Sequence, residues 1–111
     1  MKILVIISSN DSETVWNAFR FATTSLSYDN AVTVFLIGHG VEAAGVGTLT
    51  YDVTEQLDLF RNNGGVLLGC GVCCESRKQS MPYLQELLQC EMGSMQDMYR
   101  LVAEADRTIT F

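Results

Sequence analysis

The chain has 111 residues, of which 48% are hydrophobic, 18% are charged and one is proline. A chain of this length and apolar content corresponds to a single domain, residues 1–111, that buries a core without cross-links. The composition excludes intrinsic disorder, collagen-like repeats and a linker architecture. The net charge of −6 argues against direct binding to nucleic acid or to an anionic membrane surface, since an acidic protein is repelled by phosphates.

The first third of the chain has the pattern of a β-α-β unit. Residues 3–7 and 31–37 are continuous apolar runs, which are typical of strands buried on both faces. Between them, apolar residues recur every three or four positions over 14–26 and predict an amphipathic helix, preceded by turn and cap residues at 8–12. Because such a crossover joins parallel strands, the two strands should be neighbours in a parallel sheet.

The alternation continues to the end of the chain. The glycine-containing stretch 39–50 predicts a loop or a broken helix. A helix capped by Asp52, with Glu55 completing a capping box, should end at residue 62 and lead to a third strand at 66–70. The remaining elements are expected to be a short helix at 83–88, a short strand around 89–92, a helix that begins after the capping box of Ser94 and Asp97, and a strand at 107–111.

The last of these helices carries an apolar stripe that we expect to be buried, formed by Met95, Met98, Leu101 and Val102. Strands that alternate with helices predict an α/β fold in which helices cover both faces of a mainly parallel sheet of about five strands. In such folds ligands bind outside the carboxyl ends of the strands. Three segments meet that description, at residues 8–12, 38–40 and 69–77.

The segment after the third strand is the richest in chemistry, because it holds Cys70, Cys73 and Cys74. A thiol reacts as the thiolate, and its pKa falls near a helix N-terminus or beside cations. A helical turn that starts around Cys73, with Arg77 and Lys78 nearby, would supply both influences. We expect Cys70 to open onto a crevice and Cys73 to resolve a mixed disulfide or a persulfide.

The neighbouring loops could line a pocket beside these thiols. The candidate pocket residues are Ser9, Asn10, Gly38, His39, Gly71 and Arg77. His39, the sole histidine, could act as a base for a thiol or remain solvated. Residues 38–40 do not fit the dinucleotide fingerprint and the chain has no P-loop, so no cofactor is expected.

Other interpretations of the cysteines remain open. Free cysteine is among the most buried residue types, so Cys74 and Cys90 are equally well explained as small core residues. A zinc site would need Cys70, Cys73, Cys90 and His39 to converge, and there is no second C-x-x-C motif. The chain starts with a strand-like run that is too short for a secretory or membrane segment, so we expect a cytoplasmic protein with reduced thiols.

Four segments together are similar to a known family. They are residues 2–11, residues 30–42, the strand and Cys-Gly-Val-Cys loop at 65–73, and the tail at 93–107. On these segments the chain resembles the DsrE/DsrF-like sulfur-relay proteins, also described as the YchN-like fold. The resemblance implies a three-layer α/β/α protein of the cytoplasm that assembles as a trimer or hexamer and carries sulfur as a cysteine persulfide.

Residue by residue, the resemblance implies that the sulfur-accepting cysteine falls on Cys70 and the second cysteine of some members on Cys73. Cys74 departs from that pattern. The leading hypothesis is therefore a sulfurtransferase-like carrier that takes sulfur from a donor protein and hands it to an acceptor protein. The alternatives are a non-catalytic oligomeric scaffold or small-ligand-binding module that uses the loop after the second strand and, third, a zinc site.

Overall fold

A computed structural model describes all residues of the chain, 1–111. The elements along the chain are β1 (Lys2–Ile7), α1 (Ser12–Ser27), β2 (Ala31–Leu36), the 3-10 helix η1 (Gly38–Gly45), α2 (Val53–Asn62), β3 (Val66–Cys70), α3 (Gly71–Ser76), α4 (Leu84–Leu88), β4 (Glu91–Gly93), α5 (Met95–Glu104) and β5 (Arg107–Thr110). No helix is both long enough and apolar enough to cross a bilayer.

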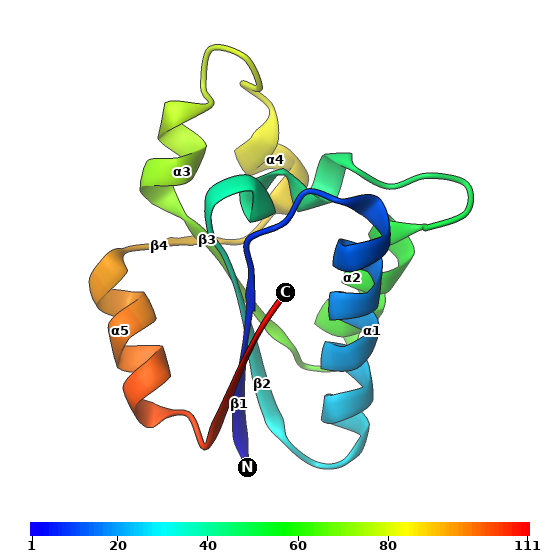
Figure 1. Cartoon of the computed structure of the whole chain (residues 1–111), viewed down its shortest axis with the longest axis vertical. Helices are drawn as coiled ribbons and strands as arrows, with labels where there is room; N and C mark the ends of the chain where they lie inside the picture. Colours follow the sequence, from blue (N-terminus) through cyan, green and yellow to red (C-terminus); the bar gives the residue numbers. More distant parts are fainter.

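The five strands form one sheet in the order β4-β3-β2-β1-β5, and every neighbouring pair is parallel. Helices α1 and α2 lie on one side of this sheet and α5 lies on the other, while α3 and α4 lie beyond the carboxyl ends of the strands (Figure 1). The chain moves outward from β1 to β4 and then returns across the opposite face to β5. The predicted α/β fold with a parallel sheet of five strands is confirmed.

The core lies mainly between the sheet and the paired helices. Val5 and Val34 are completely buried in the two central strands, as expected for strands covered on both faces. Between α1 and α2, the rings of Phe19 and Phe60 pack with their centroids 5.9 Å apart. Local signals set the ends of the helices, since the expected capping box of Ser94 is present in full at the start of α5.

The apolar stripe of α5 departs from its expected burial. No residue of this helix is fully buried, and Met95 and Val102 are 64% and 43% exposed. The physical reason is that α5 has no partner helix on its face of the sheet, whereas α1 and α2 pack against each other (Figure 1). The spacing of the apolar residues was predicted correctly, but the sheet alone buries only those side chains of α5 that face the strands.

Candidate functional site

The cysteine-bearing segment is helical from its first residue. Helix α3 begins at Gly71, directly after β3, and not around Cys73 as expected. Cys70 occupies the N-cap position, where its Sγ accepts the backbone N–H of Cys73 at 3.4 Å. The sulfur atom of Cys70 therefore accepts the capping hydrogen bond that a serine or aspartate oxygen accepts at the start of other helices. This contact orients the Cys70 side chain toward the turn that carries Cys73.

The second thiol connects the ends of two strands. Sγ of Cys73 accepts the backbone N–H of Gly38, which follows β2, at 3.2 Å. Gly38 has φ of +57°, in the left-handed region that glycine adopts most readily. The chain then turns into η1, where Gly40 packs so closely that an added Cβ would lie 1.9 Å from the carbonyl oxygen of Ile7. Two glycines thus allow the segment after β2 to approach both β1 and Cys73.

The exposure of Cys70 differs from the expectation. Cys70 is buried, with 6% of its surface exposed, and so does not open onto a crevice, whereas Cys73 is half-buried. Burial is also the main reason that the pKa of Cys73 is raised; the neighbouring Cys70 thiol raises it further, and the Gly38 N–H and Arg77 only partly oppose this. The expected activation of Cys73 through a lowered thiol pKa is therefore wrong.

A carboxylate that the sequence did not single out holds the surrounding loops together. Oε2 of Glu42, on η1, lies 2.9 Å from Nε of Arg77 and 3.2 Å from Nδ1 of His39, and Oε1 accepts from Nδ2 of Asn10 at 3.4 Å. We call these four residues the Glu42 cluster. Burial acts to raise the pKa of Glu42, but the hydrogen bonds from its three partners outweigh burial, and the pKa is lowered.

The Glu42 cluster reaches the thiols through Arg77. Besides its contact with Glu42, Arg77 donates from Nη1 to the backbone carbonyl of Cys73 at 3.1 Å. Arg77 acts to lower the pKa of Cys73 and of Cys74, but burial outweighs it at both thiols. Lys78 lies 3.9 Å from Glu75, both side chains being exposed, and is not an activating cation either. The cluster thus positions the helix that bears Cys73 relative to η1.

The predicted pocket residues are only partly brought together. Asn10, His39 and Arg77 meet at Glu42, and Gly38 contacts Cys73. Ser9 instead accepts the N–H of Asp11 at 3.0 Å within its own turn. Gly71 is the first residue of α3 and makes the connection between the strand and the helix. No sequence motif marks Glu42; its only local signal is its position three residues after His39.

The remaining cysteines serve the core. Cys74 is 4% exposed, and Cys90 follows α4, where burial above all raises its thiol pKa to about 11. All four cysteines are free thiols. The chain contains no group of three or more His, Cys, Asp or Glu side chains that is placed to hold a metal ion, so the structure does not assemble the zinc ligands considered from the sequence.

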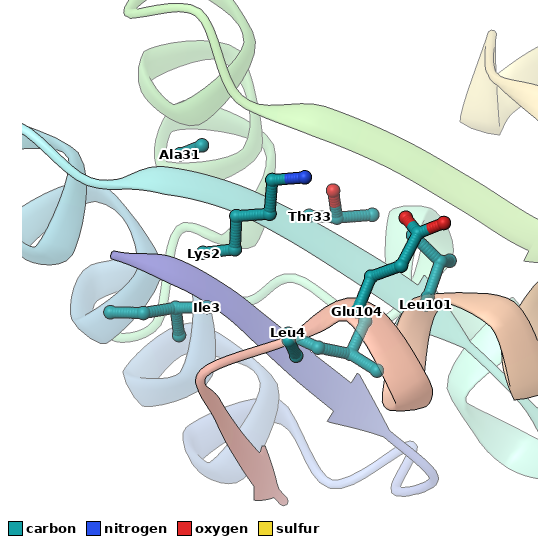
Figure 2. A pocket seen from close by; sticks show the side chains of 8 residues that line it. Lys2, Ile3, Leu4, Ala31, Thr33, Leu101 and Glu104 are labelled. Carbon is teal, nitrogen blue, oxygen red and sulfur yellow. The ribbon is translucent and has the colours of Figure 1, made fainter.

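The cavity shown in Figure 2 lies away from the thiols. It has a volume of about 190 Å³ and lies at the amino ends of β1 and β2, under α5. Figure 2 shows Lys2 and Thr33 on the strands facing Leu101 and Glu104 of α5. Five cavities of about 100 to 370 Å³ are lined by neither Cys70 nor Cys73, although the one of about 100 Å³ between α3 and α4 touches Cys74. Of the two thiols, only the half-buried Cys73 is accessible from outside.

Comparisons with known proteins identify the family of the chain and two of its relatives. The model of the DsrE/DsrF-like family matches residues 1–111, which confirms the resemblance seen in the sequence. An uncharacterized protein of Methanocaldococcus jannaschii is 33% identical over 116 aligned residues and covers 100% of both chains. Another, from Methanopyrus kandleri, is 32% identical over 114 residues and covers 98% of this chain and 93% of the relative.

A solved structure extends the comparison to the fold. A conserved protein of unknown function from Bacteroides thetaiotaomicron superposes with a TM-score of 0.77, covering 99% of this chain and 94% of its own. The two sequences are 16% identical, so this similarity concerns the fold alone.

Proposed function

The chain belongs to the DsrE/DsrF-like family, and from that premise we propose that it is a sulfur-relay protein that carries sulfane sulfur as a persulfide on the Cys70–Cys73 pair. The observation that carries the proposal is the meeting of two free thiols at the carboxyl end of β3. Each sulfur accepts a backbone N–H, from Cys73 and from Gly38 respectively. Persulfidation is a reversible modification of reactive thiols.

The exposure of the thiols supports Cys73 as the residue that receives the sulfur, in place of Cys70 as expected from the resemblance. A donor reaches a half-buried thiol more readily than one that is 6% exposed. The thiolate of Cys73 attacks the outer sulfur of a donor persulfide; a new S–S bond forms and the donor leaves as a thiolate. Delivery is the same exchange in reverse direction, with an acceptor thiolate attacking the outer sulfur on Cys73.

The surroundings of Cys73 support proteins as donor and acceptor. The thiol pair lines none of the five cavities described above, and the adjacent Val72 is 79% exposed. A half-buried thiol beside an exposed apolar side chain suits the docking of another protein better than the enclosure of a small molecule. Exchange also requires reduced thiols, so we place the protein in a reducing compartment such as the cytoplasm.

We propose that the chain works as a homo-oligomer, a trimer or a hexamer, as the resemblance implies. The exposed side chains of Met95, Tyr99 and Val102 on α5 form an apolar surface that a second copy would cover. If so, Met95→Glu should lower the mass measured by analytical ultracentrifugation. An unchanged mass, or a wild-type protein that is monomeric, would contradict this assignment.

The sulfur-carrier proposal is tested by mass spectrometry. The reduced protein is mixed with inorganic polysulfide or with a persulfide-loaded donor protein, quenched with acid soon after mixing, and digested without reductant. We expect a gain of about 32 Da, one sulfur atom, on Cys73. The gain should disappear in Cys73→Ser and persist in Cys90→Ser, the matched control. Absence of the adduct from both the wild type and Cys70→Ser would refute the proposal and favour a non-catalytic scaffold.

A small-ligand-binding module has less support. The loop after β2 that would bind such a ligand is folded into η1, where Gly40, Val41 and Ala43 are buried. The backbone of this segment is therefore occupied by its own packing. Its Gly38 N–H is directed at Cys73, which ties the segment to the thiol site.

A further inference from the structure

The two thiols of the site lie where a disulfide can form between them. Cys70 is the N-cap of α3 and Cys73 is the third residue of that helix. Residues three apart at the start of a helix have Cα atoms about 5 Å apart, which is within the range of a disulfide. The contact from the N–H of Cys73 to Sγ of Cys70, at 3.4 Å, already directs the Cys70 side chain toward Cys73. Closure requires side-chain rotation and no rearrangement of the strands.

We propose that Cys70 discharges the persulfide on Cys73, so that the protein releases its sulfur as hydrosulfide when no acceptor thiol is docked. This inference rests on the proposed function, because it starts from a persulfide on Cys73. The Cys70 thiol gives up its proton and attacks Sγ of Cys73. The Cys70–Cys73 bond forms, and the bond from Sγ to the outer sulfur breaks.

The reaction balances without an external oxidant. The outer sulfur leaves with the electron pair of the broken bond and takes up the proton, giving hydrosulfide. The outer sulfur is reduced by one electron and the Cys70 sulfur is oxidised by one, whereas Sγ of Cys73 belongs to an S–S bond before and after the step and is unchanged. A dithiol reductant then reopens the disulfide by thiol exchange and returns both thiols for the next cycle.

The burial difference decides which sulfur each partner attacks. A donor or acceptor approaches Cys73 from solvent, so the outer sulfur lies on the exposed side of the site. Cys70 is 6% exposed, and its Sγ lies 3.4 Å from the backbone N of Cys73, so we infer that it approaches from the interior and attacks the inner sulfur, Sγ of Cys73. An external thiol therefore takes the outer sulfur and becomes persulfidated, whereas Cys70 takes Sγ and expels the outer sulfur. One persulfide has two products, and docking of an acceptor selects between them.

The other cysteines are poorly placed for this step. Cys74 is the residue after Cys73, and adjacent residues on a helix do not face each other. Cys90 carries a thiol whose pKa is raised to about 11, mainly by burial, so the population of its thiolate is low at neutral pH. Cys70 is therefore the thiol that performs the discharge.

The test follows sulfur and thiols together. The reduced protein is loaded with inorganic polysulfide, desalted and incubated without thiols; hydrosulfide is measured by its colorimetric assay, and the protein is weighed intact. We expect one hydrosulfide per persulfide lost, and a product about 2 Da lighter than the reduced protein, as one disulfide requires. Cys70→Ser should retain its added mass of about 32 Da and release no hydrosulfide. Cys74→Ser, the matched control, should behave as the wild type.

Cys70→Ser is a suitable variant because serine is a preferred N-cap residue and keeps the start of α3. Its outcome separates the inference from the proposed function. If neither the wild type nor Cys70→Ser gains sulfur, the carrier proposal fails. If the wild type is loaded on Cys73 but keeps its persulfide as long as Cys70→Ser does, the carrier proposal stands and the discharge is refuted. A disulfide that forms equally well in Cys70→Ser through Cys74 also refutes the role of Cys70.

Discussion

Replacing Glu42 by glutamine should destabilise the protein far more than the same replacement at Glu75. Both glutamates contact a cation, but the side chains of Glu42 and Arg77 are 12% and 18% exposed and 2.9 Å apart, whereas those of Glu75 and Lys78 are 68% and 73% exposed and 3.9 Å apart. Glutamine preserves the shape of the side chain and removes its charge. The comparison therefore sets the partly buried, charged contacts of Glu42 with Arg77, His39 and Asn10 against one exposed ion pair.

The expected magnitude follows from these exposures. A hydrogen bond to a charged group contributes about 1.5–3 kcal/mol, whereas an exposed ion pair contributes about 0–1 kcal/mol. We expect Glu42→Gln to lower the free energy of unfolding by about 2 kcal/mol and Glu75→Gln by less than about 0.5 kcal/mol. With an unfolding entropy of about 2.1 cal/mol/K per residue over 111 residues, 2 kcal/mol lowers Tm by about 9 °C.

The loss of stability in Glu42→Gln should depend on pH. The pKa of Glu42 in the folded protein is lowered from its ordinary value of 4.5, so its contribution is present above that pH and is lost as the pH falls through the folded pKa. The difference in Tm between wild type and Glu42→Gln, measured by circular dichroism, should therefore be full near neutral pH and shrink below about pH 4.5. Equal Tm values for the two variants, or a difference that does not shrink in acid, would refute the reasoning.

The other predictions concern the thiols and the glycines. Because the Cys70 thiol helps to raise the pKa of Cys73, Cys70→Ser should shift the pH profile of Cys73 alkylation to lower pH; an unchanged profile would contradict that coupling. Cys90, whose thiol pKa is about 11, should resist iodoacetamide in the native protein near neutral pH and react once unfolded; rapid native labelling would show that it is not buried. Gly40→Ala should lower the free energy of unfolding, measured with denaturant, by more than about 2 kcal/mol, because its Cβ would lie 1.9 Å from the carbonyl oxygen of Ile7. Gly45→Ala, whose Cβ would have nothing within 4 Å, should lower it little. Similar losses in the two variants would refute the close approach of Gly40 to Ile7.

The features that could be predicted from the sequence are those that depend on residues close together in the chain. Buried strands appear as continuous apolar runs, helices as stripes, and the start of α5 as a capping box at Ser94. The position of the cysteines at the carboxyl end of β3 followed from the same patterns. Each of these features depends on residues within one or two turns of each other.

The features that sequence reasoning missed depend on packing between distant segments. Glu42 contacts residues from the segments after β1, β2 and β3, and no local sequence pattern predicts these contacts. The same holds for exposure at the thiols, since a C-x-x-C motif gives the spacing of Cys70 and Cys73 but not which of them the fold covers. Likewise, the stripe of α5 has the correct period, but its burial depends on whether a second helix shares its face of the sheet.

The order of the strands has a consequence for how the chain folds. β1 pairs with β5 along the edge opposite to β2, and Asp106 and Phe111 donate their backbone N–H groups to Lys2 and Ile6. During folding this edge of β1 has no neighbour until residues 107–110 have folded back against it. An unpaired apolar edge is a template for pairing with another chain. A folding intermediate in which β5 has not yet docked therefore exposes this edge of the first strand to pairing with another chain.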